Sequence, residues 1–151
     1  RSLYELAGRL GLGDRLRRVG FRDDLETVLG AADAVVVAST EPDPLPNAAL
    51  EAAAAGCCVV AAGHGGLPEI VRDGETGVLF APRDHRALAA ALADVAADPG
   101  AAARLGSAAA YDVRGRFSAD ALLDAVQDLY HDVLSPRLER LAHRAGELLS
   151  D

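Results

Sequence analysis

Two short, uninterrupted apolar runs, at 34–38 and 59–61, constrain the fold more than any other feature of this sequence. Strands that are covered on both faces have such continuous apolar sequences, because neither side of the strand meets water. Further strands are predicted at 16–21 and 78–80, and helical patterns separate the strands. Strands that alternate with helices indicate a parallel sheet wound by helices on both sides. We therefore predict an α/β chain with a Rossmann-like sheet.

The helix signals are clearest around the second run and after it. Pro46 suits a first helical turn, because its missing N–H is not needed there, and Gly56 ends that helix. Residues 84–151 hold helical patterns alone, which predicts a helical tail with helices that begin at Asp84, Pro99, Ser118 and Pro136. We expect the last helix to pack on the sheet. No repeat or linker divides the chain, so we predict one domain over 1–151.

Composition excludes several classes of function. The net charge is -8, which argues against a nucleic-acid partner, because such proteins need a basic face. Glu51 interrupts the longest apolar run, so no segment is expected to span a membrane. The adjacent thiols of Cys57 and Cys58 fall in a predicted buried strand and are expected to be inert, which favours the cytoplasm.

Candidate site residues lie in loops that follow strands. In a doubly wound sheet, ligands bind beyond the carboxyl ends of the strands. Three loops leave such ends, at 21–24, 39–47 and 63–67. The loop at 39–47 leads directly into a helix, so a carboxylate and a helix N-terminus are expected side by side.

The helix start and its two flanking carboxylates predict a ligand of three parts. The N–H groups of Asn47, Ala48 and Ala49 have no acceptor within the helix, and the dipole favours an anion there. Glu51 lies one turn further along, and a carboxylate that accepts two hydroxyl donors suits a ribose. Asp43 on the loop suits a sugar ring in the same way. The predicted ligand is a sugar joined to a nucleoside through a diphosphate.

Each of these residues also has a simpler interpretation. Glu51 on a helix is more often a solvated surface residue, and Asp43 before proline more often forms a turn. The glycines of 63–66 alone indicate close packing, and His64 is more often a polar loop residue than a base.

The joint order of these elements is more specific than any one of them. It comprises Pro-Asp-Pro-Leu-Pro-Asn-Ala-Ala-Leu-Glu-Ala-Ala-Ala-Ala-Gly at 42–56, Val-Val-Ala-Ala at 59–62 and Gly-Gly-Leu-Pro-Glu-Ile-Val-Arg-Asp-Gly-Glu-Thr-Gly-Val-Leu-Phe at 65–80. From the N-terminus to about Tyr130, the chain resembles the C-terminal half of glycosyltransferase family 4. Members of that family are GT-B enzymes that use nucleotide sugars.

The resemblance assigns roles to individual residues. In that family, two carboxylates separated by seven residues flank the donor, and Asp43 and Glu51 have this spacing. The resemblance implies that Glu51 binds the ribose hydroxyls and that Asp43, where the family usually has glutamate, binds the hexose hydroxyls. Glu41 is an alternative to Asp43, but its spacing to Glu51 is two residues too long.

The family also implies contacts through backbone amides. The amides of Leu45, Asn47 and Ala48 are expected to contact the sugar and the diphosphate, and Gly65 and Gly66 are expected to border the same cleft. The proline after Leu45 stands where the family often has glycine, so one amide contact is lost.

By this resemblance, several parts of the family's structure are expected to lie outside this sequence. These are the basic pair that binds the diphosphate, the N-terminal acceptor domain, and the first two strands of the C-terminal domain. In the family's strand order, the two strands lie between 16–21 and 34–38. We therefore expect either direct pairing of these two segments or self-association through exposed sheet edges.

The resemblance implies the donor-binding part of a retaining glycosyltransferase that moves a hexose from a nucleotide-diphosphate sugar to an acceptor hydroxyl. We expect no metal or cofactor, no complete catalytic set in this chain, and no activity of the chain alone. The alternative is a non-catalytic nucleotide-sugar-binding or assembly domain; an epimerase is disfavoured by the run at 68–74. The expected location is cytoplasmic, with peripheral contact to the inner membrane face as an option through Arg137, Arg140 and Arg144.

Overall fold

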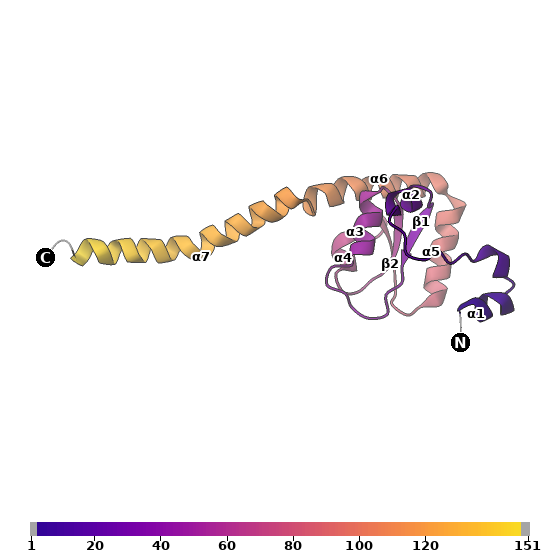
Figure 1. Ribbon diagram of the computed structural model, residues 1–151. Coiled ribbons are helices and arrows are strands. Elements are labelled where there is room, and N and C mark those ends of the chain that lie inside the picture. Colours follow the sequence, from indigo (N-terminus) through magenta and orange to yellow (C-terminus); the bar gives the residue numbers. More distant parts are fainter. Residues whose placement is uncertain (1–2, 149–151) are drawn as a thin grey trace.

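The computed structural model describes residues 3–148, and it describes side-chain surroundings as far as residue 140 (Figure 1). The elements are α1 (Leu3–Arg9), the short 3-10 helix η1 (Gly13–Arg15), α2 (Leu25–Gly30), β1 (Ala34–Val37), α3 (Asn47–Ala54), β2 (Cys58–Ala62), α4 (Leu67–Ile70), β3 (Gly77–Phe80), α5 (His85–Ala97), α6 (Pro99–Arg116) and α7 (Ala119–Leu148).

The described strands form one parallel sheet in the order β1-β2-β3. The central strand β2 is buried along its whole length, as its unbroken apolar sequence predicts. Helices α3, α5 and α6 contact it, and α3 and α5 flank the strands in Figure 1. The prediction of an α/β chain with a parallel sheet is confirmed.

Capping residues set the helix starts of the tail. The Asp84 carboxylate accepts hydrogen bonds from the amides of Arg86 and Ala87, at 2.9 and 3.0 Å, and these bonds lower the pKa of Asp84. The Ser118 hydroxyl accepts from the amide of Ala121 at 3.1 Å. From Asp84 to Leu148 the tail is helical in α5, α6 and α7, as predicted.

The prediction of a strand at 16–21 is wrong. These residues have no regular structure, and the side chain of Phe21 is fully exposed. A strand needs a neighbour for its hydrogen bonds, and within the described residues β1 pairs with β2 alone. Direct pairing between 16–21 and β1 is therefore not formed. The strand β1 is an edge strand, and it is not covered on both faces as expected, because Val36 is 41% exposed.

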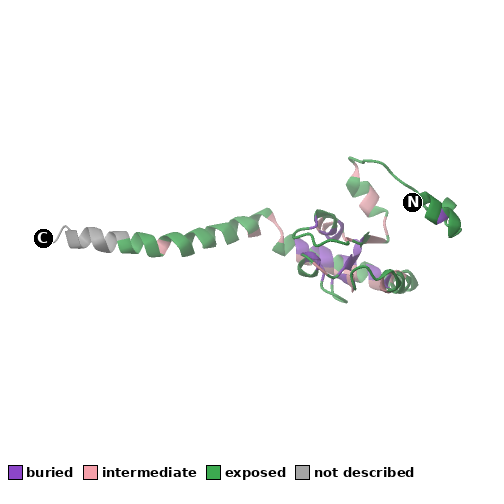
Figure 2. Ribbon diagram, turned by 90° about the horizontal axis from the view of Figure 1, so that it is seen from below, coloured by how far each residue is buried: buried purple, intermediate pink, exposed green. Residues whose placement is uncertain are grey.

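Helix α7 differs from the prediction in two ways. It continues through Pro136, where a new helix was expected to begin. A proline removes one backbone donor and strains the helix, but it does not always end it. The helix also projects away from the sheet instead of packing on it (Figures 1 and 2), and Leu122, Leu129 and Tyr130 are each more than 60% exposed. Leu138, in the helix that was expected to begin at Pro136, is 63% exposed, and the side chains beyond residue 140 are not described.

Candidate functional site

Two loops meet at the carboxyl end of the sheet, the Asp43 loop (residues 39–46) and the glycine loop (residues 63–66). The amide of Gly66 donates to the carbonyl of Asp43 at 2.8 Å. A Cβ atom on Gly65 would lie 2.6 Å from the Asp43 carbonyl oxygen, and one on Gly66 would lie 2.1 Å from that of Pro44. Gly65 also has φ of 58°, a conformation that favours glycine. The structure therefore brings Asp43, Gly65 and Gly66 together, and this approach requires glycine.

The Asp43 side chain forms a turn. Its Oδ1 atom accepts a hydrogen bond from the amide of Leu45 at 3.0 Å, so Asp43 forms the turn that its position before proline indicates. The Leu45 amide is engaged within the loop, and the Asp43 carboxylate is exposed. The second carboxylate oxygen, Oδ2, receives no hydrogen bond from any described residue. It is the acceptor that Asp43 presents to solvent.

Two side chains hold the Asp43 loop from outside. His64 Nε2 lies 2.8 Å from the Ser39 carbonyl oxygen and donates to it, because a carbonyl only accepts. Arg83 donates to the Thr40 carbonyl at 3.3 Å and to Glu41 Oε1 at 2.6 Å. Glu41, the alternative to Asp43, is thus ion-paired. Sequence reasoning missed Arg83, because no local signal links residues that lie so far apart in the chain.

The start of α3 presents backbone donors. The carbonyl of Pro46 accepts the amides of Ala49 and Leu50, at 3.0 and 3.4 Å. The prediction that the Ala49 amide lacks an acceptor is therefore wrong. The amides of Asn47 and Ala48 precede these bonds, both residues are exposed, and neither amide has a hydrogen-bond acceptor in the described part of the chain. Two donors at a helix N-terminus favour an anion.

Glu51 lines a separate cavity. The cavity has a volume of about 890 Å³ and lies between α3 and the segment 23–30, with Arg114 on its wall. The predicted ligand loop at 21–24 thus contributes Asp23 and Asp24 to the walls around Glu51. Asp43, Leu45, Gly65 and Gly66 do not line this cavity. The structure therefore places the two carboxylates at two positions that α3 joins, with the Asn47 and Ala48 amides between them in sequence.

Nearby charged groups already have partners. Arg22 forms an ion pair with Asp24, and this hydrogen bond lowers the pKa of Asp24. Arg114 donates to the carbonyl of Ala54 at 2.9 Å. A further cavity, of about 550 Å³, lies at the opposite end of the sheet, where Cys57 precedes β2 and Cys58 begins it. Both thiols are buried, and burial raises their pKa, so neither is a reactive thiolate.

The chain is similar to several proteins of known activity. It is 38% identical over 87% of its length to D-inositol 3-phosphate glycosyltransferase of Streptomyces bingchenggensis, and it covers 29% of that relative. It is 42% identical over 76% of its length to glycogen synthase of Mycobacterium tuberculosis, covering 28% of that protein. The chain therefore spans about a third or less of the length of these curated relatives.

Solved structures agree with the sequence comparisons. HepE of Anabaena in complex with UDP-glucose matches with a TM-score of 0.79 at 30% identity, over 87% of this chain and 36% of HepE. The same protein in complex with UDP matches with a TM-score of 0.82. The family described as glycosyl transferases group 1 matches residues 1–112. The chain therefore belongs to the group 1 glycosyl transferases, and its fold is that of the GT-B members of that family.

Proposed function

We propose that this chain is the donor-binding part of a retaining glycosyltransferase that moves a hexose from a nucleotide-diphosphate sugar to an acceptor hydroxyl. The observation that carries the proposal is the contact between the Asp43 loop and the glycine loop at the start of α3. This contact holds Asp43, one carboxylate oxygen of which faces solvent, in the loop that leads into α3, and the first two amides of α3 have no acceptor among the described residues. The similarity to HepE, which has been solved with UDP-glucose, supports the class of ligand.

Each part of the donor has a chemically matched partner. The Asp43 Oδ2 atom accepts hexose hydroxyls, and the amides of Asn47 and Ala48 donate to the diphosphate at the positive end of α3. Glu51 accepts the two ribose hydroxyls from the wall of its cavity. Gly65 and Gly66 contribute by lacking side chains, which lets the two loops approach.

The chemistry needs more positive charge than the described site supplies. Transfer develops negative charge on the leaving diphosphate, and fixed donors and cations stabilise that charge. The cation that holds the Asp43 loop, Arg83, and the cation on the wall of the Glu51 cavity, Arg114, are bonded to Glu41 and to the carbonyl of Ala54. We infer that the rest of the protein supplies the diphosphate cations and the acceptor site, that no metal or other cofactor takes part, and that this chain alone is inactive.

A mutation of Glu51 tests the donor site. In the full protein, Glu51→Ala removes the acceptor of the ribose hydroxyls. Leaving two hydroxyls unpaired should weaken the binding free energy of the nucleotide sugar by more than ~1.4 kcal/mol, which raises the KM at least ~10-fold. Asp94→Ala, which removes an exposed carboxylate on α5, is the matched control and should leave the KM unchanged. Full activity of Glu51→Ala would exclude the assigned donor site.

A non-catalytic nucleotide-sugar-binding or assembly domain is the second candidate. It is favoured by Pro46, which cannot donate an amide bond, and by the exposed apolar residues of α7, which offer a surface for another domain. This candidate predicts that the full protein binds a nucleotide sugar without transferring the hexose. No helix among the described residues is long and apolar enough to cross a membrane.

We propose a cytoplasmic location on a separate ground, because Cys57 and Cys58 are buried free thiols.

A further inference from the structure

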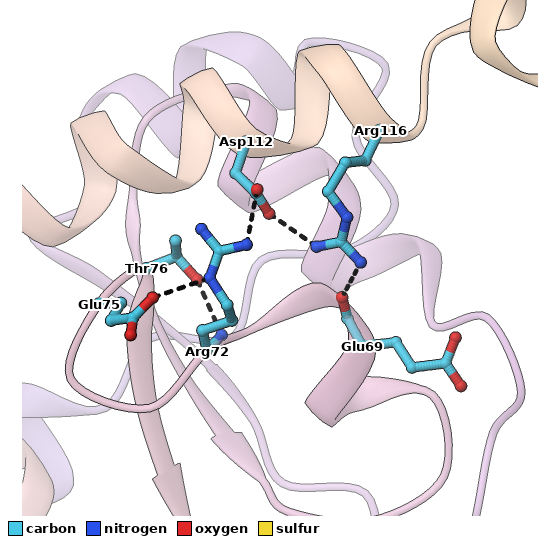
Figure 3. A network of polar contacts seen from close by, with 6 residues as sticks. All are labelled: Glu69, Arg72, Glu75, Thr76, Asp112 and Arg116. Carbon is cyan, nitrogen blue, oxygen red and sulfur yellow. Dashed lines mark hydrogen bonds and ion pairs between the residues drawn. The ribbon is translucent and has the colours of Figure 1, made fainter.

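One carboxylate on α6 holds two arginines (Figure 3). The Oδ1 atom of Asp112 accepts from Arg72 at 2.7 Å, and its Oδ2 atom accepts from Arg116 at 2.8 Å. The Asp112 side chain is 11% exposed. Burial alone would raise the pKa of Asp112, but the hydrogen bonds from the two guanidinium groups outweigh it, and the pKa is lowered. Asp112 is therefore a charged anchor between two cations.

The two arginines connect this anchor to α4 and to the turn that follows it. Arg116 also donates to the carbonyl of Glu69 at 2.8 Å, in the last turn of α4 (Figure 3). The last carbonyls of a helix lack donors from the helix itself, and a cation there also complements the helix dipole. The Arg72 amide donates to the Thr76 hydroxyl at 2.8 Å. The C-terminal end of α4 is thus fastened to α6 through Asp112.

The other end of α4 forms the candidate site. The amide of Glu69 donates to the carbonyl of Gly66 at 3.1 Å, and the amide of Gly66 donates to the carbonyl of Asp43 at 2.8 Å. Because α4 is a single turn of four residues, a shift at its C-terminal end moves its N-terminal end as well. A continuous series of hydrogen bonds therefore leads from Asp112 through Arg116 and α4 to Asp43.

Apolar packing also holds α4, because Leu67 and Ile70 are each 1% exposed. Packing of this kind is not directional, so it sets how deeply the helix lies without fixing the orientation of its ends. Hydrogen bonds to the Glu69 carbonyl have a preferred direction and restrict that orientation. The two contributions are separable by experiment, because loss of the hydrogen bonds leaves both apolar side chains in place.

We propose that Asp112 is a positioning residue for the donor site. Through Arg116 it fixes the end of α4, and α4 in turn sets the glycine loop against the Asp43 loop. As far as the ligand is concerned, this inference rests on the proposed function. The contact between the glycine loop and the Asp43 loop is a property of the protein alone and is measurable without a ligand.

Asp112→Asn in the full protein is the test, because it keeps the shape of the side chain and removes its charge. Hydrogen exchange of peptides spanning 63–70 should become faster, and the Kd for UDP-glucose should rise, each by about 2- to 30-fold. Asp112→Glu should restore part of both effects. Glu75→Gln is the matched control, because Glu75 bonds Arg72 from a position that is 70% exposed, and it should change neither readout.

The readouts separate the possible failures. If Asp112→Asn lowers the free energy of unfolding but leaves exchange at 63–70 and the Kd at wild-type values, Asp112 has a structural role alone and the inference is wrong. If the wild type does not bind UDP-glucose, the proposed donor site fails for that ligand, while exchange still decides the positioning role. If Asp112→Asn does not fold, Arg116→Gln removes the bond to Glu69 and gives the same two readouts.

Discussion

Substitution of Gly66 by alanine tests the contact on which the candidate site depends. The added Cβ would lie 2.1 Å from the Pro44 carbonyl oxygen, whereas real Cβ atoms essentially never approach another atom closer than 3.0 Å. One of the two backbones must therefore move by about 1 Å. Gly66 has φ of -80°, which alanine adopts without strain, so the effect is purely steric.

The cost of such overpacking is ~1–3 kcal/mol in the free energy of unfolding. The same movement lengthens the 2.8 Å bond from the Gly66 amide to Asp43 and displaces the Asp43 carboxylate. We therefore expect Gly66→Ala to lose that stability and also to bind UDP-glucose at least ~10-fold more weakly. Urea unfolding and calorimetric titration of the full protein measure the two effects.

Two other glycines provide controls. A Cβ on Gly63 would lie 3.5 Å from its nearest neighbour, so Gly63→Ala should change stability by less than ~0.5 kcal/mol. A Cβ on Gly106 would lie 2.0 Å from the Gly56 carbonyl oxygen, outside the two loops, so Gly106→Ala should lower stability but weaken binding less than Gly66→Ala does. If Gly66→Ala matches Gly63→Ala in both measurements, or if Gly106→Ala weakens binding as much as Gly66→Ala does, the contact between the two loops does not position the donor site.

Two further predictions concern carboxylates with lowered pKa values. Asp84→Ala should lower the urea midpoint, because α5 loses its cap. The folded pKa of Asp84 is lowered from its ordinary value of 3.8, so the difference in midpoint from wild type should shrink as the pH falls below 3.8. A difference that grows in acid would contradict this prediction. The urea midpoint of Asp112→Asn should likewise differ most from that of wild type above pH 3.8, and the two midpoints should converge in acid, because the folded pKa of Asp112 is lowered. A constant difference between the two midpoints from pH 7 to pH 3 would show that the ion pairs contribute no stability.

Local patterns predicted several elements correctly and failed for others. The apolar run of β2 and the proline before α3 were sufficient for those two elements, and the cap at Asp84 was sufficient for α5. The segment 16–21 has apolar residues at Leu16, Val19 and Phe21, but a strand also depends on a partner that the pattern does not contain. The exposure of α7 has the same origin, because an apolar helix face does not specify what covers it.

For similar reasons, only part of the candidate site was predictable from the sequence. The spacing of Asp43 and Glu51 and the glycines at 65 and 66 are features of the sequence alone, and the structure places both glycines against the Asp43 loop. The roles of Arg83 and Asp112 depend on ion pairs between residues 40 or more positions apart. Such pairs cannot be identified until the fold brings the residues together.

Hydrogen exchange of the full protein with and without UDP-glucose shows which segments the donor contacts. If the donor binds across the start of α3, the ligand should protect peptides that cover 43–51 and 63–67, and it should leave α5 unchanged. The Glu51→Ala variant should lose this protection at the same ligand concentration. Protection that is absent from 43–51, or that is equally strong in Glu51→Ala, would contradict the account.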